Sequence, residues 1–258
     1  MRRVNKAAGA AGRTLELLAC IAAGENEFTL KDIAGRARLA PSTTHRLLEL
    51  WVRKDLLLRI DPGTYQLGPA LFQVCAQLTR KFEISLQSRP VLKTLWDEFQ
   101  ETCVLCLYHP SSVTATVGVS LASPHPLKYD LPVQSGVPLG WGSLGRSILA
   151  HLPAPDVDTV LARERFGPIS KSALPPRSTV LRELALIRKR GYATYRSRTT
   201  NIAGVSAAVL LPDGRVAGSV GVVMPTSRLS RAMAVRLPAA VLESAARLAD
   251  SLPVSDRA

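Results

Sequence analysis

The sequence has few cysteines and no long hydrophobic run, and each shortage excludes a class of protein. Four cysteines in 258 residues are too few for a disulfide-rich secreted scaffold and suit a reducing compartment. No stretch approaches the roughly 18 consecutive apolar residues that a membrane-spanning helix requires. The basic N-terminus MRRVNKAAGAAGR leads into no apolar segment of the kind found in secretory signals. We therefore expect a cytoplasmic protein without a membrane partner.

Acidic residues are also scarce, with 20 Asp and Glu against 33 Lys and Arg, which gives a net charge of +13. Such an excess favours anionic partners, nucleic acids among them. The basic residues are spread along the chain, so charge alone does not locate a binding site. With 47% hydrophobic residues, the chain can bury the core of one large domain or of two ordinary ones.

The first 68 residues have the pattern of three helices followed by a β-hairpin. Residues 1–12 are rich in Ala, Gly and basic residues, and they predict a flexible basic arm. In the first helix, helical spacing favours an inner face made of Leu15, Leu18, Ala19 and Ala22. GENEF interrupts this helix, and Thr29 is a suitable N-cap for the second. The inner side of the second helix is expected to be Leu30, Ile33, Ala34 and Ala37.

The third helix begins near Pro41, which fits a first helical turn because that position needs no N–H. Its core face is predicted to be Thr44, Leu47, Leu48 and Trp51. LLLRIDPGTYQLG then predicts two short strands around an Asp-Pro-Gly-Thr turn. Three helices and a hairpin indicate a winged helix-turn-helix over residues 13–68, whose third helix enters the DNA major groove.

The stretch APSTTHRLLELW could belong to a catalyst or to a DNA-reading helix. Ser42 and His45 lie three positions apart, but no Asp is placed to orient the imidazole and no oxyanion donors are evident. Short hydroxyls and an arginine at a helix start suit phosphates and guanine instead. A merely solvated helix face is the third reading. We favour the DNA-reading helix, and the candidate DNA-binding residues are Ser42, Thr43, Thr44, His45, Arg46, Arg53 and Arg59, although Thr44 could be mostly structural.

Strands alternate with helices after a predicted linker helix at 69–82. TCVLCLYHP and SVTATVGVS predict strands, and STVLRELALIRKRGYA predicts a helix that ends at Gly191. GVSAAVLLPDGRVAGSVGVVM predicts two central strands because it is apolar on both faces. The fold class is therefore α+β, with a winged helix-turn-helix domain, a linker helix and a second domain over 83–258.

The chain resembles the IclR family of bacterial transcriptional regulators over almost its full length. The matching segments are TLKDIAGRARLAPSTTHRLLELWVRKDLL, YQLGPAL, GVPLGWGSLGRSILAHL, ELALIRKRGYA and GVSAAVLLPDGRVAGSVGVV. The resemblance implies a GAF-like effector-binding and oligomerisation domain after the DNA-binding domain. It also implies dimers or tetramers, pseudo-palindromic double-stranded DNA operators and a small organic effector. Candidate effector-binding residues are Gly140, Trp141, Gly142, Ala207, Gly221 and Val223.

Several positions depart from the family pattern. Arg38 replaces a usual Gly in the turn between the second and third helices, which costs about 1 kcal/mol if the residue is left-handed. Trp141 replaces a small residue, and Thr199 and Thr200 replace an acidic pair. Gly221 and Val223 replace serines that hold the ligand carboxylate in relatives binding small oxo-acids. These changes favour a larger, less polar effector, such as an aromatic compound.

Two further motifs have structural readings that we prefer. GWGSLG matches a dinucleotide fingerprint, but it lacks the strand before it and the acidic strand end after it, so we expect a flexible glycine loop at the effector pocket. Cys103, Cys106 and His109 have metal-ligand spacing. Side chains alternate along a strand, so the two cysteines point to opposite faces and are expected to be buried small residues. We expect no metal and no cofactor.

The sequence thus predicts a ligand-responsive, sequence-specific DNA-binding regulator without catalytic activity. A repressor is favoured, and a transcriptional activator of the same family is the alternative. An enzyme that turns over a small molecule in the second domain, and a non-specific nucleic-acid-binding protein, are the alternatives from other classes.

Overall fold

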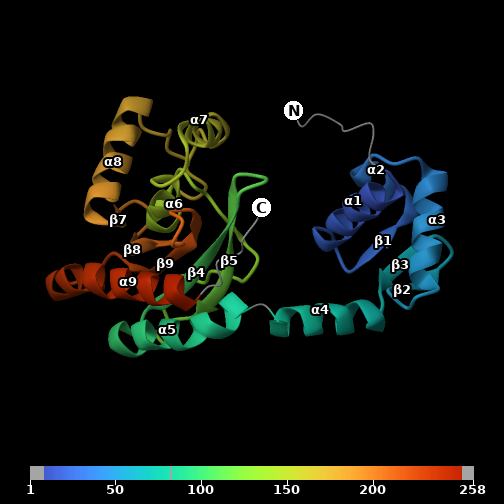
Figure 1. Ribbon diagram of the computed structural model, residues 1–258, viewed down its shortest axis with the longest axis horizontal. Helices are drawn as coiled ribbons and strands as arrows, with labels where there is room; N and C mark the ends of the chain where they lie inside the picture. The colour runs from blue at the N-terminus through green and yellow to red at the C-terminus, as the bar shows by residue number, and fades with distance from the viewer. Residues whose placement is uncertain (1–8, 82, 252–258) are drawn as a thin grey trace. The chain divides into compact units, whose positions relative to one another are not determined.

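The computed structural model describes residues 9–81 and 83–251, and the chain divides into two compact units with the boundary between residues 82 and 83 (Figure 1). The predicted flexible arm falls mostly on residues 1–8, which lie outside the described residues. Its predicted end at residue 12 is wrong, because Ala10 already begins the first helix.

The N-terminal unit is a winged helix-turn-helix. Its elements are α1 (Ala10–Ala22), β1 (Glu27–Thr29), α2 (Leu30–Ala37), α3 (Pro41–Val52), β2 (Leu57–Asp61) and β3 (Thr64–Leu67). The hairpin β2–β3 turns at Pro62 and Gly63, and Gly63 has the positive φ of 84° that such a turn favours. β1 pairs with β3 in the antiparallel order β1-β3-β2. This strand was missed by sequence reasoning, which treated the segment after α1 only as a break.

The core of this unit joins all three helices to the wing. Its buried residues include Leu17, Ile33, Leu48, Trp51 and Tyr65. The predicted inner faces of α2 and α3 are confirmed. The predicted inner face of α1 is wrong: Leu17 and Ile21 are buried, whereas Leu15, Leu18, Ala19 and Ala22 are exposed. Leucines occur on more than one side of α1, so spacing alone did not select the side that packs on α2.

The thirteen-residue helix α4 (Pro69–Lys81) occupies the place where a linker helix was predicted. Residue 82 separates it from α5 (Glu83–Phe99), which belongs to the second unit. Two large apolar side chains of α4, Phe72 and Leu78, are 75% and 58% exposed.

The C-terminal unit is built on one six-stranded antiparallel sheet of order β6-β5-β4-β9-β8-β7. The strands are β4 (Thr102–His109), β5 (Thr114–Leu121), β6 (Gly136–Val137), β7 (Tyr192–Ser197), β8 (Ile202–Leu210) and β9 (Val216–Pro225). The predicted pair β8–β9 is central, and its strands are almost completely buried. The edge strand β7 was not predicted as a strand.

Helices cover both faces of this sheet (Figure 1). α5 and α9 (Arg231–Ser251) pack on one face, and α6 (Gly142–Leu149) packs on the other against β7, β8 and β9. α7 (Ala154–Arg163) and α8 (Arg177–Arg190) lie on the α6 side, and α8 ends at Gly191 in the left-handed conformation, as predicted. The α+β fold class is therefore confirmed. No helix among the described residues is both long enough and apolar enough to cross a bilayer.

Candidate functional site

The N-terminal half of α3 has one side in the core and one side toward solvent. Thr44 is 0% exposed, and its hydroxyl donates to the Ala40 carbonyl at 3.1 Å. Thr44 therefore serves the fold, which corrects its inclusion among residues that reach DNA. Ser42, His45 and Arg46 are exposed, and Thr43 is half-buried. Because no side chain caps the start of α3, its first backbone N–H groups add to a surface suited to phosphate.

The two other candidate DNA-binding residues sit in different surroundings. Arg53 is exposed at the C-terminal end of α3, about 16 Å along the helix axis from Ser42. Arg59 of the wing forms an ion pair with Glu49 of α3, and its guanidinium lies 5.6 Å from the centre of the Tyr65 ring. Its charge is partly neutralised within the protein, and the pair fastens the wing to α3.

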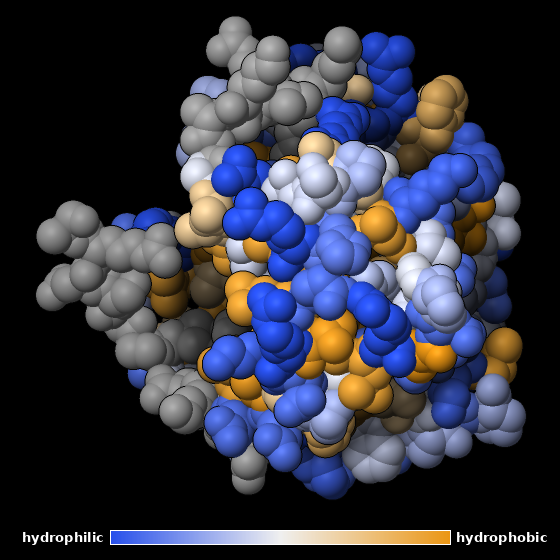
Figure 2. Space-filling model, turned by 90° about the vertical axis from the view of Figure 1, so that its right-hand side faces the viewer, coloured by the Kyte–Doolittle hydropathy of each residue, from blue (hydrophilic) through white to orange (hydrophobic). Residues whose placement is uncertain are grey.

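The face of the molecule that carries α3 and the wing is mostly hydrophilic. Long hydrophilic side chains lie between small hydrophobic patches on this side (Figure 2).

The residue between α2 and α3, Arg38, has φ 53° and ψ 40°, which is the left-handed conformation considered from the sequence.

A cavity of about 410 Å³ opens beside the N-terminus of α6 in the C-terminal unit. The loop before α6, strands β7 to β9 and the segment after α7 form its walls. Most of the lining is apolar, and the residues include Tyr129, Leu131, Val137, Trp141, Gly142, Ser143, Leu144, Ile169, Tyr195, Thr200, Ile202 and Val223. Its size falls within the range of small-molecule pockets.

Trp141, Gly142 and Val223 line this cavity, as expected from the sequence. Ala207 does not, because it packs into the core on the opposite face of the sheet, beneath α5 and α9. Gly221 lies away from the cavity in the contact between the sheet and α6, and a Cβ there would stand 2.5 Å from Ser206 Cβ. Gly221 is thus a packing residue. These two assignments to the pocket are corrected by the structure.

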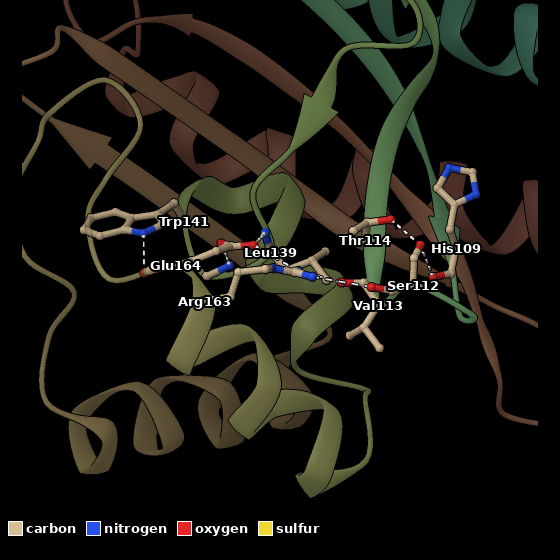
Figure 3. A network of polar contacts seen from close by, with 9 residues as sticks. His109, Ser112, Val113, Thr114, Leu139, Trp141, Arg163 and Glu164 are labelled. Carbon is tan, nitrogen blue, oxygen red and sulfur yellow. Dashed lines mark hydrogen bonds and ion pairs between the residues drawn. The ribbon is translucent and has the colours of Figure 1, made fainter. Parts of the chain in front are cut away.

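Gly140 is not part of the cavity lining either, which corrects its predicted assignment to the pocket, and Glu164 holds the loop that contains it. The carboxylate of Glu164 accepts the N–H groups of Leu139 at 3.2 Å and Gly140 at 2.8 Å, and its backbone carbonyl accepts the Trp141 indole N–H at 3.4 Å (Figure 3). The buried Arg146 donates through Nε to the Gly140 carbonyl at 2.8 Å. Hydrogen bonds therefore hold the loop on both sides, and Trp141 stands in the cavity wall between them, in a segment where the sequence led us to expect a flexible loop.

The residue before Glu164 extends this network to the β4–β5 turn. Arg163 donates to the carbonyls of Val113 at 2.7 Å and Ser112 at 3.4 Å, and it lies 3.5 Å from the Glu164 carboxylate (Figure 3). Val113 has a φ of 51°, which is uncommon for a β-branched residue. The network thus joins the Trp141 loop, the end of α7 and a strained turn.

Two hydroxyl groups are left without partners at the cavity. Ser143 is 4% exposed, and its hydroxyl has no hydrogen-bond partner among the described residues. The buried Oγ1 of Thr200 also lacks a partner. No side chain caps the N-terminus of α6, so its first N–H groups face the same space. Sequence reasoning missed Ser143, and it noted Thr200 only as a departure from the family.

The Cys103, Cys106 and His109 segment shows the predicted alternation. Cys103 and Cys106 are both fully buried, on opposite faces of the sheet, and burial raises the pKa of each thiol to about 12. His109 Nε2 lies 2.9 Å from the Thr116 hydroxyl. Among the residues that the structure describes, no three His, Cys, Asp or Glu side chains are grouped as metal ligands.

Both units match models of one protein family. The family model described as the IclR helix-turn-helix domain matches residues 10–59, and the bacterial transcriptional regulator IclR C-terminal model matches residues 76–250. The chain belongs to the IclR family. This IclR-family protein is 26% identical to the transcriptional repressor IclR of Escherichia coli over 182 residues, which are 70% of this chain and 66% of that protein, slightly under two thirds. It is 28% identical over 240 residues to the HTH-type regulator BhcR of Paracoccus denitrificans, covering 92% and 84% of the two chains.

Solved structures share the fold of this IclR-family protein. A putative IclR regulator from Silicibacter superposes with a TM-score of 0.79 at 22% identity, covering 94% of this chain and 95% of that one. An IclR homologue from Microbacterium hydrocarbonoxydans, solved with 4-hydroxybenzoate, gives a TM-score of 0.71 at 21% identity, covering 96% of this chain and 100% of that one.

Proposed function

We propose that this IclR-family regulator is a repressor that binds operator DNA through α3 and responds to a small aromatic acid in the cavity beside α6. The observation that carries the DNA-binding part is the division of α3 into a buried side, with Leu48 and Trp51, and an exposed side that presents Ser42 and Arg46. Hydroxyls and uncapped N–H groups suit phosphate, and an arginine can bind guanine through two hydrogen bonds.

The cavity supports the choice of effector. Its apolar walls and the fixed indole of Trp141 suit a flat ring. The partnerless hydroxyls of Ser143 and Thr200, together with the open N-terminus of α6, suit a carboxylate at one end of the ligand. The relative solved with 4-hydroxybenzoate is consistent with a ligand of this chemical class.

Control of the operator requires more than one reading helix. In a homodimer, two α3 helices would meet two half-sites about one DNA turn apart, and a pseudo-palindromic operator would mirror the symmetry of the protein. An effector that binds more tightly when the two helices are placed differently lowers the affinity for the operator. The size of that decrease is set by the difference between the effector's affinities for the two placements. A tetramer would work in the same way with two such pairs.

Fluorescence anisotropy with labelled DNA from upstream of the gene's own locus tests the proposal. We expect Arg46→Ala to weaken specific binding by about 1–3 kcal/mol, or 5- to 150-fold, with the oligomeric state by light scattering unchanged. Equal affinity for unrelated DNA would contradict sequence-specific binding.

Aromatic acids are then titrated into the complex, and release of the DNA with the acid recovered unchanged supports a repressor with a sensor domain. A turned-over ligand would favour the enzyme alternative, and tighter DNA binding would favour an activator.

A further inference from the structure

The cavity beside α6 differs at its two ends in exposure and in charge. Ser143, in the first turn of α6, is 4% exposed, whereas Asp130, in the loop between β5 and β6, is exposed to solvent. Both residues line the cavity, which therefore has an inner end at Ser143 and an outer end at Asp130. Among the described residues, Asp130 is the only charged one in the lining, so a bound anion meets no cationic side chain there.

The inner end is built around Gly204 of β8. A Cβ at Gly204 would lie 2.7 Å from Ser143 Oγ, so this hydroxyl occupies the space where a side chain would begin. Tyr195 of β7 is the cross-strand partner of Gly204, and it also lines the cavity. The Tyr195 hydroxyl, like those of Ser143 and Thr200, has no hydrogen-bond partner among the described residues. The inner end therefore offers hydroxyl donors that the fold itself does not use.

Asp130 is held in place by its two neighbours in the chain. The Tyr129 hydroxyl donates to the Thr200 carbonyl at 2.7 Å, and the Tyr129 carbonyl accepts the Thr102 hydroxyl at 3.0 Å. Leu131 packs against the core on the α6 side of the sheet. Within the part of the chain that the structure describes, the Asp130 carboxylate forms no hydrogen bond or ion pair. The outer end of the cavity thus has a negative charge that no described residue neutralises.

We infer that the cavity selects its effector by charge at both ends. The effector is an aromatic monocarboxylate that carries a hydrogen-bond donor, most favourably a cationic one, opposite its carboxylate. Ser143 and Tyr195 bind the carboxylate beside the first N–H groups of α6, and Asp130 accepts the donor at the outer end. A second carboxylate would lie beside Asp130 with no cation to offset the repulsion, so dicarboxylates are excluded. This inference rests on the proposed function and adds the charge of the far end of the ligand.

The experiment uses the full-length protein and three benzoates of similar size that differ in the group opposite the carboxylate. 4-(Aminomethyl)benzoate carries a cation there, 4-ethylbenzoate a neutral group and 4-(carboxymethyl)benzoate an anion. Isothermal titration gives the affinity of each probe for the wild type, for Asp130→Asn and for Tyr195→Phe. The neutral probe is the reference, because differences in hydrophobicity between the probes cancel when affinity ratios are compared between two proteins.

Two variants outside the cavity lining are the matched controls. Asp97→Asn removes an exposed carboxylate of α5 that pairs with Lys93, and it changes the net charge by the same amount as Asp130→Asn. Tyr192→Phe removes the hydroxyl of the tyrosine three positions before Tyr195 in β7, which packs against the core on the opposite face of the sheet. Both controls should keep the wild-type affinity for all three probes.

We expect Asp130→Asn to lower the affinity for the aminomethyl probe, relative to the ethyl probe, roughly fivefold, and to raise that for the carboxymethyl probe by a similar factor. Both shifts should shrink at high salt, because salt screens the interactions of an exposed charge. Tyr195→Phe should weaken the binding of all three probes about equally, roughly tenfold, because each has the same carboxylate at the inner end.

Unchanged affinity ratios in Asp130→Asn would overturn the inference, as would wild-type affinity of Tyr195→Phe for all three probes. A shift of the same size in Asp97→Asn would also overturn it, because net charge and not the outer end of the cavity would then be responsible. Failure of the wild type to bind any of the three probes would refute the aromatic acid of the proposed function, and this inference with it.

Discussion

Replacing Glu164 by glutamine tests whether the fixed loop around Trp141 shapes the effector pocket. The Glu164 side chain is 15% exposed, and its two oxygens accept N–H groups from Leu139 and Gly140. Glutamine keeps one acceptor and turns its NH₂ group toward the other N–H. A hydrogen bond to a charged group contributes about 1.5–3 kcal/mol. The variant therefore loses about 2 kcal/mol of the free energy that stabilises the ordered conformation of the loop.

That loss sets an upper limit on the change in effector binding. If the ordered loop is required for binding, 2 kcal/mol lowers effector affinity by at most about thirtyfold. Isothermal titration measures the affinity, and a red shift in tryptophan emission of the ligand-free variant would report a loosened Trp141. Operator binding without effector stays at the wild-type level, because the change lies in the C-terminal unit.

Asp158→Asn is the matched control for Glu164→Gln. Asp158 lies on α7, six residues before Glu164, and forms an ion pair with Arg177 in which both side chains are more than half exposed. Such surface pairs contribute about 0–1 kcal/mol. The control removes the same charge and should leave effector affinity and emission unchanged. Wild-type effector affinity together with wild-type emission in Glu164→Gln would refute the reasoning about the loop.

Four further predictions concern the C-terminal unit, one of them by comparison with Cys75 of α4. Tryptophan emission should change on saturation with the true effector because Trp141 lines the cavity, and constant emission would place the ligand elsewhere. Gly145→Ala should destabilise this unit by several kcal/mol in urea unfolding, since its Cβ would lie 1.9 Å from a backbone oxygen; wild-type stability would contradict this close packing. Thiol reagents at pH 8 should modify exposed Cys75 before buried Cys103 and Cys106. Equal labelling of all thiols would contradict this order. The pKa of both buried thiols is raised to about 12, so stability should be full below about pH 9, where unfolded thiols begin to ionise, and fall as the pH rises toward 12; unchanged stability over that range would refute the pH dependence.

Local patterns were enough to predict the parts of the fold that are specified by neighbouring residues. The inward face of α3, the Asp-Pro-Gly-Thr hairpin and the end of α8 at Gly191 each depend on spacing or turn chemistry within a few positions. α1 failed because both Leu17 and Leu15 suit a core, and only packing on α2 selects between them. The short strand β1 exists because β3 lies beside it, which its own three residues do not encode.

The pocket was less predictable because its residues are brought together from distant segments. Trp141 could be assigned from the glycine loop next to it, but Glu164, which fixes that loop, is 23 residues further along the chain and belongs to no motif. Tyr129 and Thr200 meet through a hydrogen bond across 71 positions, from the Tyr129 hydroxyl to the Thr200 carbonyl. No periodicity within either segment signals this contact.

Gly221 shows how a departure from a family pattern can have a packing cause. Serine at this position would need a Cβ 2.5 Å from Ser206 Cβ and 2.6 Å from the Val205 carbonyl oxygen, where no such atom fits without movement of the strands. Ser206 in turn donates to Ser147 of α6 at 3.3 Å, so the space is already used to join the helix to the sheet.

The close contact between α6 and the sheet limits what an effector can move. Ser219 of β9 donates to the Leu144 carbonyl at 3.0 Å, and Gly145 contacts the backbone at Pro138 and Leu139. Interiors packed this closely have little room for small displacements. α6 cannot approach the sheet further, so the cavity at its N-terminus has one fixed wall. Differences in ligand size must therefore be accommodated by the loops that contribute the opposite wall, which include Leu131 and Ile169.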